Sequence, residues 1–286
     1  MSNRKRKIII GKCRICGREG KLSFEHVPPQ KAYNQETVIE YTLENWTGNQ
    51  RVKGKQRQGG IGKYTLCEKC NPDTGSWYGT EYGRWATMAF DALNILNNHP
   101  DILSGKNAIA VTLKDVYPLR FLKQVITCLF SVISVSHGSS FADNNLELVK
   151  FILDKNQTNL PETYNFYLSL YRKPSILRRI SLAGKLTVPY NKDMRGNIIS
   201  GTIKSKHASV FSEMAHPPFA LVMSHGTPFQ NATDISYFKN FHYDECIDLI
   251  LLLKIGIGFT PYPGSYREPL LVTAIKRDNK AYREWK

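Results

Sequence analysis

The sequence predicts an α+β protein, with a small cysteine-containing N-terminal module followed by a larger, mostly antiparallel domain. Three observations predict it: two Cys-x-x-Cys pairs in the first 70 residues, a helical segment directly after the second pair, and short alternating apolar and polar runs from residue 164 onward. At 286 residues the chain is long enough for two such units. The His99-Pro100 step marks the expected boundary between residues 1–98 and 99–286.

The N-terminal module begins with two expected strands. Residues 8–27 predict a short strand, a turn at the first cysteine pair, and a second strand over Lys21–His26 that ends before Pro28-Pro29. Residues 31–62 mix five glycines with four basic residues after Trp46, which favours an irregular, mobile basic loop. Such a loop either closes on a phosphate backbone or is a solvated connection.

A helix is expected from about Pro72 to Leu96, because Asn71-Pro72-Asp73 has the composition of a helix start. The rest of the chain predicts a strand over 108–113 and two helices over 119–135 and 145–153. Further short strands are expected over 164–171, 175–188, 198–204, 208–214, 219–224 and 247–254.

The chain is strongly basic, with 39 Lys and Arg against 24 Asp and Glu, a net charge of +15. Such a surface attracts phosphate polyanions, although a basic protein with no nucleic-acid role has the same balance. The basic start is followed by only three isoleucines, too few for a secretory signal, and no apolar run is long enough for a membrane span. We therefore expect a cytoplasmic protein with no membrane association.

The two cysteine pairs, Cys13/Cys16 and Cys67/Cys70, predict one structural zinc ion. Four thiolates in two close pairs satisfy tetrahedral zinc, and such a site contributes on the order of 10 kcal/mol or more to folding. A redox dithiol is the alternative, but a redox motif does not occur as two copies that frame a loop.

Between these pairs lies Glu25-His26, and Asn71 follows the last cysteine directly. Adjacent strand residues face opposite sides, so the two side chains serve different purposes. A neutral imidazole takes a proton from water, whereas carboxylate and amide oxygens suit Mg²⁺ or Mn²⁺. Considered alone, the Glu-His dipeptide is more typical of a surface pair, and only the flanking cysteine pairs make it specific.

At these residues the chain resembles the HNH, or ββα-metal, endonuclease family in its zinc-knuckle form. The resemblance covers about residues 10–90 and rests on Cys13-x-x-Cys16-Gly17, Phe24-Glu25-His26-Val27-Pro28-Pro29 and Leu66-Cys67-x-x-Cys70-Asn71. It implies that His26 is the general base, that Glu25 and Asn71 hold a catalytic Mg²⁺ or Mn²⁺, and that basic side chains position the nucleic acid. The basic candidates are Lys21, Arg51, Lys53, Lys55, Arg57 and Lys69.

The chain departs from the family pattern in two places. Asn71 stands where a histidine is usual, and the middle asparagine is missing from the stretch Gly60–Tyr64 before the second pair. The resemblance implies a metal-dependent endonuclease, with DNA the favoured substrate. By analogy with bacterial defence nucleases, residues 99–286 would select the substrate or bind a nucleotide or protein regulator. The alternatives are an inactive zinc-containing protein that binds nucleic acid and a zinc-stabilised adaptor.

Overall fold

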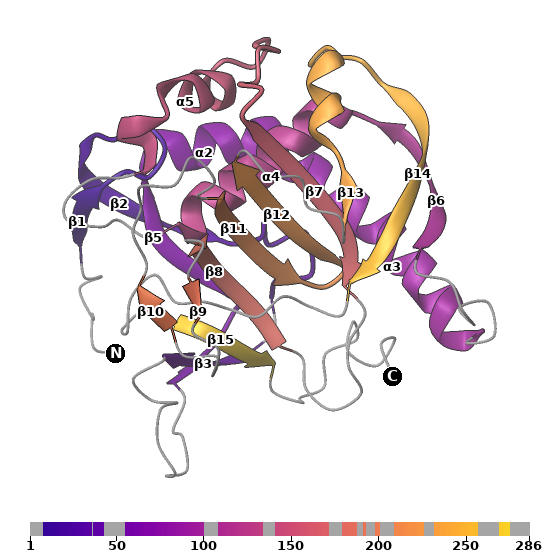
Figure 1. The fold of residues 1–286 in the computed structure, drawn as a ribbon, viewed down its shortest axis with the longest axis horizontal. Coiled ribbons are helices and arrows are strands. Elements are labelled where there is room, and N and C mark those ends of the chain that lie inside the picture. Colours follow the sequence, from indigo (N-terminus) through magenta and orange to yellow (C-terminus); the bar gives the residue numbers. More distant parts are fainter. Residues whose placement is uncertain are drawn as a thin grey trace, which may run out of the picture.

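Antiparallel strands form the larger part of this protein's framework, as the computed structural model shows (Figure 1). The structure describes residues 8–35, 37–42, 55–99, 108–133, 141–171, 179–187, 191–192, 198–200, 209–225, 232–256 and 269–274. Helices and strands are mixed along the chain, which confirms the predicted α+β class and the mostly antiparallel pairing.

The large sheet has ten strands, in the order β4-β3-β15-β8-β11-β12-β7-β14-β6, with β13 paired to β7 off this path. Among its described pairs only β14 and β7 run parallel. The strands are β3 (Val38–Thr42), β4 (Lys55–Arg57), β6 (Ala108–Val116), β7 (Tyr164–Tyr171), β8 (Arg179–Thr187), β11 (Ser209–His216), β12 (Phe219–His225), β13 (Thr233–Asp234), β14 (Ile247–Gly256) and β15 (Pro269–Ala274).

A separate three-stranded sheet carries the motifs of the N-terminal module. Its order is β1 (Ile9–Lys12), β2 (Glu19–His26) and β5 (Gly62–Cys67), all antiparallel. The β2–β5 register pairs Leu22 with Cys67 and His26 with Gly62. This pairing puts the first cysteine turn and the second cysteine pair at one end of the sheet, and His26 at the other. The short strands β9 (Asn191–Lys192) and β10 (Ile198–Ser200) pair with each other.

The helix predicted from about residue 72 to 96 is present, and it consists of three joined parts. They are α2 (Cys70–Thr74), the π-helical turn η1 (Gly75–Gly79) and α3 (Thr80–Asn98). A π-turn widens a helix locally and is frequent at functional sites. The other helices are α4 (Pro118–Val132), α5 (Leu146–Leu153) and the 3-10 turns η3 (Phe141–Asn144) and η4 (Ser236–Asn240), in agreement with the two helices predicted over 119–135 and 145–153.

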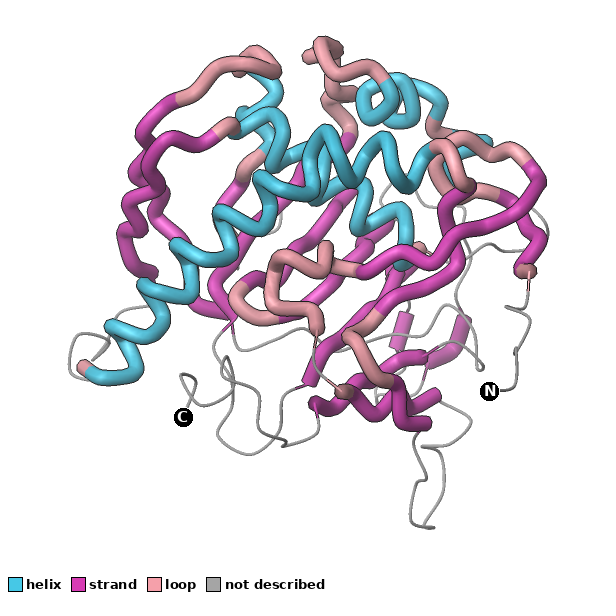
Figure 2. The backbone as a smooth tube through the Cα atoms, turned by 180° about the vertical axis from the view of Figure 1, so that it is seen from behind, coloured by secondary structure: helices cyan, strands magenta, loops and turns pink. Residues whose placement is uncertain are grey.

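Helix α4 is buried along its whole length except at Arg120. It lies with α3 across one face of the large sheet (Figure 2). The Trp85 ring of α3 stacks on the Phe121 ring of α4, with centroids 4.0 Å apart and planes 11° apart. Because α4 contacts β11 and β12 on one side and α3 on the other, it forms the centre of the molecule.

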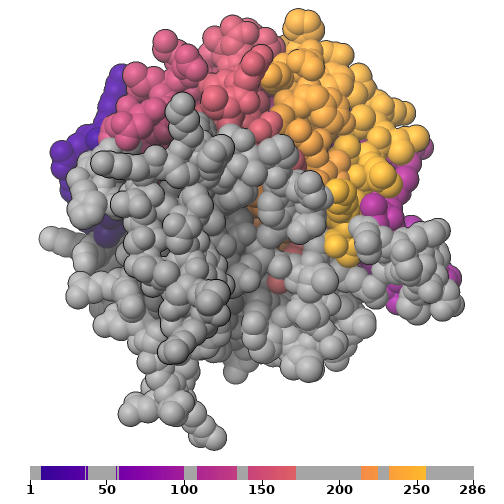
Figure 3. Space-filling view, viewed as in Figure 1, coloured from indigo at the N-terminus to yellow at the C-terminus, as the bar shows by residue number. Residues whose placement is uncertain are grey.

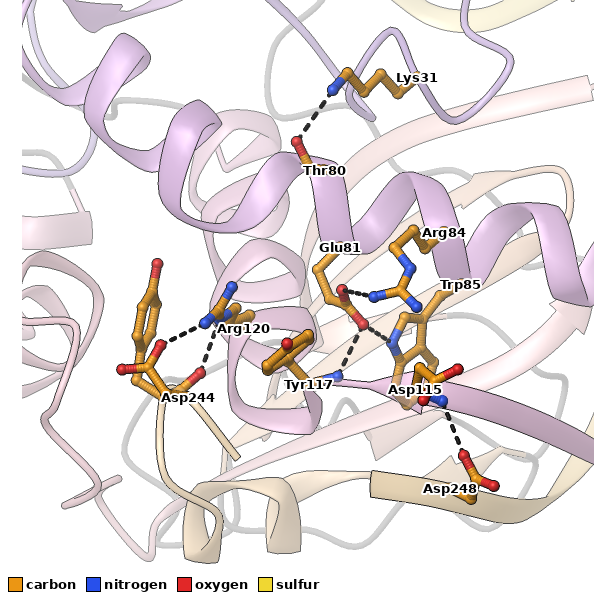
Figure 4. A network of polar contacts seen from close by, with 11 residues as sticks. Lys31, Thr80, Glu81, Arg84, Trp85, Asp115, Tyr117, Arg120, Asp244 and Asp248 are labelled. Carbon is orange, nitrogen blue, oxygen red and sulfur yellow. Dashed lines mark hydrogen bonds and ion pairs between the residues drawn. The ribbon is translucent and has the colours of Figure 1, made fainter. Parts of the chain in front are cut away.

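A buried carboxylate fixes the connection between α3 and α4 (Figure 4). Glu81 Oε1 accepts hydrogen bonds of 2.9 Å from the Trp85 indole and from the backbone N–H of Tyr117, which directly precedes α4. Arg84 lies 3.4 Å from the other carboxylate oxygen. Apolar side chains from both sides of residue 99 share one core cluster. The division into residues 1–98 and 99–286 stays a prediction.

The expectation of an irregular stretch over residues 31–62 is wrong at Val38–Thr42 and Lys55–Arg57, where β3 and β4 form, and residues 43–54 of that stretch lie outside the described residues. The run Val-Ile-Glu-Tyr-Thr is rich in β-branched and aromatic residues, but a five-residue run becomes a strand only with a partner. Its partner is β15, more than 220 residues later, itself not predicted. Local patterns carry no information on such a distant pairing.

The space-filling view shows where the N-terminal strands, α5 and β14 reach the surface (Figure 3). In the space-filling view, the N-terminal strands and β14 lie at opposite sides of the molecule, with α5 and the segment after it between them (Figure 3). Among the described helices, none combines the length and the apolar character that crossing a membrane requires.

Candidate metal and catalytic site

Four cysteine side chains meet at one end of the small sheet. Cys13 and Cys16 lie in the turn between β1 and β2, Cys67 ends β5, and Cys70 begins α2. Their sulfur atoms all lie within 4.8 Å of one another, and Cys16 Sγ is 3.9 Å from Cys67 Sγ. These positions suit four thiolate ligands around one metal ion such as zinc, which agrees with the predicted ligand set.

The backbone around the cluster supports metal binding. The Cys70 N–H donates to Cys67 Sγ at 3.4 Å, and the Gly17 N–H donates to the Cys13 carbonyl at 2.9 Å. Gly17 has φ +71°, a conformation that favours glycine. A hydrogen bond from the Cys70 thiol lowers the pKa of Cys13 to about 4, and the same contact raises the pKa of Cys70. The lowered pKa of Cys13 favours its thiolate, the form that binds a metal.

His26 ends strand β2, and a glycine turn orients its ring. His26 Nε2 lies 2.9 Å from the carbonyl oxygen of Gly59. A carbonyl only accepts, so a neutral ring carries its proton on Nε2, and Nδ1 is the nitrogen able to take a proton. Gly59 and Gly60 have φ values of +78° and +91°, so the turn requires glycine to present this carbonyl.

Asn34 contacts the glycine turn beside His26, and it lies outside the stretch Gly60–Tyr64 in which the middle asparagine is expected. Its side chain is buried and bonds three backbone groups at 2.7 Å each: Nδ2 donates to the carbonyls of Pro28 and Ile61, and Oδ1 accepts from the Ile61 N–H. A Cβ at Gly60 would come within 2.1 Å of the Asn34 carbonyl oxygen. Asn34 therefore holds the segment after His26 against the glycine turn.

The Glu25 carboxylate and the His26 ring have different partners: α4 and β5 hold the carboxylate, and the glycine turn holds the ring. The carboxylate is buried, accepting hydrogen bonds from Ser131 of α4 at 2.7 Å and from Thr65 of β5 at 2.9 Å. Burial raises the pKa of Glu25 to about 7, against the opposing effect of these two hydrogen bonds. Arg14 donates to the Ser131 carbonyl at 2.7 Å and adds a weaker opposing charge.

Asn71 lies in the first turn of the helix, one residue after Cys70. Its Nδ2 donates to Ser23 Oγ at 2.9 Å and to the Phe24 carbonyl at 3.0 Å. These bonds tie the helix start to β2 and use both amide hydrogens. The amide oxygen, Oδ1, is the atom left to bind a cation or a donor.

One pocket of about 190 Å³ unites the three predicted catalytic residues. Its lining comes from the end of β2, the start of the following loop, the α2–η1 helix and one face of α4. The lining residues are Phe24, Glu25, His26, Pro29, Gln30, Asn71, Thr74, Gly75, Gln124 and Thr127. The last two were missed by the sequence analysis, because nothing local to α4 signals that it borders residues 25–71.

The predicted nucleic-acid contacts are only partly described. Lys21 forms an exposed ion pair of 2.6 Å with Glu68, and Lys69 one of 2.9 Å with Asp73. Lys21 lies in β2 of the small sheet, and Lys69 lies between Cys67 and Cys70 of the cluster. Lys55 and Arg57 are placed in β4 by their backbone alone. The other two candidates, Arg51 and Lys53, lie outside the described residues.

In comparisons with known proteins, no family model, no curated protein and no solved structure matches this chain.

Proposed function

We propose that this protein is a metal-dependent endonuclease that hydrolyses phosphodiester bonds in nucleic acid, with DNA the favoured substrate. The observation that carries the proposal is the pocket shared by Glu25, His26 and Asn71 beside the four-cysteine cluster. The antiparallel β2–β5 pair followed by α2 supports the ββα arrangement that the resemblance implies.

His26 is proposed as the general base. Its Nδ1 takes a proton from the attacking water, while the Gly59 carbonyl holds the Nε2 proton and stabilises the ring as it becomes charged. Water attacks phosphorus and the bond to the 3′ oxygen breaks, so the products carry a 5′-phosphate and a 3′-hydroxyl. Asn34 contributes by tying the backbone that follows His26, at Pro28, to the glycine turn at Ile61.

Glu25 and Asn71 are proposed to hold the divalent metal. The fit rests on the donor chemistry: Glu25 is a carboxyl at the pocket whose burial opposes ionisation, and a neighbouring cation offsets that penalty. Asn71 supplies an amide oxygen whose orientation its own N–H bonds fix. A bound Mg²⁺ or Mn²⁺ supplies charge stabilisation at the phosphate and at the departing oxygen.

The net charge of +15 supports a polyanionic substrate, with Lys21 and Lys69 among the proposed backbone contacts. Helix α4 belongs to the part of the chain beyond residue 99, and it borders the pocket. This supports a role for residues 99–286 in choosing the substrate or in answering a nucleotide or protein regulator, as in a defence effector.

The second candidate is a protein that binds nucleic acid without cleaving it. The observation in its favour is that both oxygens of Glu25 already accept hydrogen bonds, from Ser131 and Thr65. A carboxylate satisfied in this way needs no metal to be stable in the fold.

An activity assay separates the two candidates. Purified zinc-loaded protein is incubated with supercoiled plasmid, single-stranded DNA and RNA, with Mg²⁺, Mn²⁺ or EDTA. The proposal predicts metal-dependent nicking or cutting that leaves 5′-phosphate and 3′-hydroxyl ends. Steeply salt-dependent binding with no cleavage under either ion would support the second candidate and contradict the first.

A further inference from the structure

Gln124 of helix α4 has a buried polar atom with no partner. Its side chain is 4% exposed, and its amide oxygen accepts no hydrogen bond from any residue that the structure describes. The amide nitrogen lies 3.5 Å from the sulfur of Cys128, a weak acceptor. Leaving a buried acceptor unsatisfied costs about 1–3 kcal/mol, so such an atom requires an explanation.

Gln124 belongs to the lining of the candidate site. It shares this lining with His26 and Asn71. A Cβ built on Gly79 of η1 would be 3.7 Å from the Gln124 amide oxygen and 3.8 Å from the Pro29 ring, and Pro29 also lines the pocket. The oxygen thus lies near Gly79 and Pro29, at the part of the pocket that α4 contributes.

The neighbouring polar groups of α4 are already used. Thr127, one turn further along and in the same pocket, donates its hydroxyl hydrogen to the Lys123 carbonyl at 2.9 Å. Ser131, a further turn along, donates to Glu25. Each of these two hydroxyl groups thus has a partner among the described residues, whereas the Gln124 oxygen has none.

The chemistry of the oxygen restricts its ligand. An ionised phosphodiester offers only acceptors, so it does not satisfy an amide oxygen. A hydrated divalent cation does, because Mg²⁺ and Mn²⁺ keep several waters whose hydrogens point outward. We propose that Gln124 is an outer-shell ligand that accepts a hydrogen bond from a water on the divalent metal. This inference rests on the proposed function, since it concerns the same pocket, and it adds a residue from outside residues 10–90.

Metal binding tests the role directly and requires no cleavage. Zinc-loaded protein is titrated with Mn²⁺, and free Mn²⁺ is followed by its paramagnetic resonance signal. Gln124→Leu removes the acceptor at similar volume, and the Mn²⁺ Kd is expected to rise about fivefold, the equivalent of one hydrogen bond. Gln124→Glu keeps an oxygen and adds charge, so its Kd is expected to equal or fall below that of the wild type.

Asn94→Leu is the matched control, because it also removes a buried amide oxygen that has no partner among the described residues, but it lies on α3 outside the pocket. Its Mn²⁺ Kd is expected to match the wild type. Melting temperature and zinc content are measured for every variant, and Gln124→Met replaces the leucine variant if that one does not fold. A folded leucine or methionine variant with wild-type Mn²⁺ affinity would overturn the inference.

The outcome is independent of cleavage. Mn²⁺ binding that depends on Gln124, in a wild-type protein that cuts no nucleic acid, would support the inference and contradict the endonuclease proposal. Cleavage by the wild type, with Mn²⁺ affinity unchanged in Gln124→Leu, would do the reverse.

Discussion

The Ser131 hydroxyl donates a hydrogen bond of 2.7 Å to the Glu25 carboxylate, across 106 positions of the chain. This contact joins the strand that ends in His26 to the central helix α4. Together with Thr65 on β5, it means that three elements hold one buried carboxyl group. The candidate site therefore includes helix α4, which lies beyond residue 99, as well as the N-terminal segment that carries the four cysteines.

The first prediction concerns pH. Burial raises the pKa of Glu25 from an ordinary 4.5 to about 7, so between these pH values the folded chain binds more protons than the unfolded chain. The free energy of unfolding contributed by this group is present in full below pH 4.5 and is lost as pH rises through 7. Its expected size is roughly 3 kcal/mol. Urea unfolding without added divalent ions, from pH 5 to 8, measures it.

Glu25→Gln is the reference for that measurement, because glutamine has nearly the same shape and keeps one acceptor oxygen but does not titrate in this range. As pH rises from 5 to 8, the unfolding free energy of the wild type should fall relative to that of Glu25→Gln. Thiolate protonation affects both proteins equally and cancels in the difference. A difference that stays constant from pH 5 to 8 would show that the Glu25 carboxyl is not perturbed.

The second prediction concerns Asn34. Asn34→Ala leaves the carbonyls of Pro28 and Ile61 and the Ile61 N–H without their bonds, and the expected loss is about 3 kcal/mol of unfolding free energy. Any cleavage activity should fall as well, because the turn that orients His26 loosens. Chemical denaturation measures the first effect. Asn97→Ala, at an exposed position of α3, should stay within about 0.5 kcal/mol of the wild type.

The third prediction concerns the cysteine cluster. Cys16→Ser should reduce bound zinc from one ion per chain to a small fraction and lower the melting temperature by roughly 10 °C or more, because metal binding and folding are coupled. Elemental analysis and calorimetry measure the two effects. Cys246→Ser changes an exposed cysteine away from the cluster and should alter neither. Equal zinc content in the two variants would rule out Cys16 as a ligand.

The fourth prediction concerns the connection between α3 and α4. Glu81→Ala removes the acceptor of the buried Trp85 indole and of the Tyr117 N–H, so we expect the free energy of unfolding to fall by about 2–4 kcal/mol.

Calorimetric unfolding should show a single transition in the wild type and in Glu81→Ala, since apolar residues from both sides of residue 99 share a core. Glu68→Ala breaks only an exposed ion pair with Lys21 and should cost about 0–1 kcal/mol. Two separate transitions would indicate independent domains.

Much of the local structure could be predicted from the sequence. The strand at Tyr164–Tyr171 has the bounds that its apolar pattern predicts, and the cysteine spacing predicts the four-sulfur cluster. These features depend on residues close in sequence or on a rigid ligand geometry. The helices and strands that were predicted correctly likewise depend on patterns of residues close in sequence.

The unpredicted features all involve long-range pairing. Strand β3 forms against β15, Asn34 bonds the turn at Ile61, and α4 brings Ser131 and Gln124 to the pocket. The alternation of strand residues predicts different surroundings for Glu25 and His26, but it does not reveal which helix faces the carboxylate. Such partners follow from the packing of the whole chain, which local periodicity does not encode.

The most direct test of the central claim is the rate of nucleic-acid cleavage by wild type and His26→Ala at equal zinc content, with Mn²⁺ or Mg²⁺ present. The exposed His242 provides a control substitution outside the pocket. The account predicts a rate lower by about 10²–10⁴-fold in His26→Ala, with an unchanged melting temperature, and a wild-type rate in His242→Ala. Equal cleavage by wild type and His26→Ala would contradict the assignment of His26 as the base.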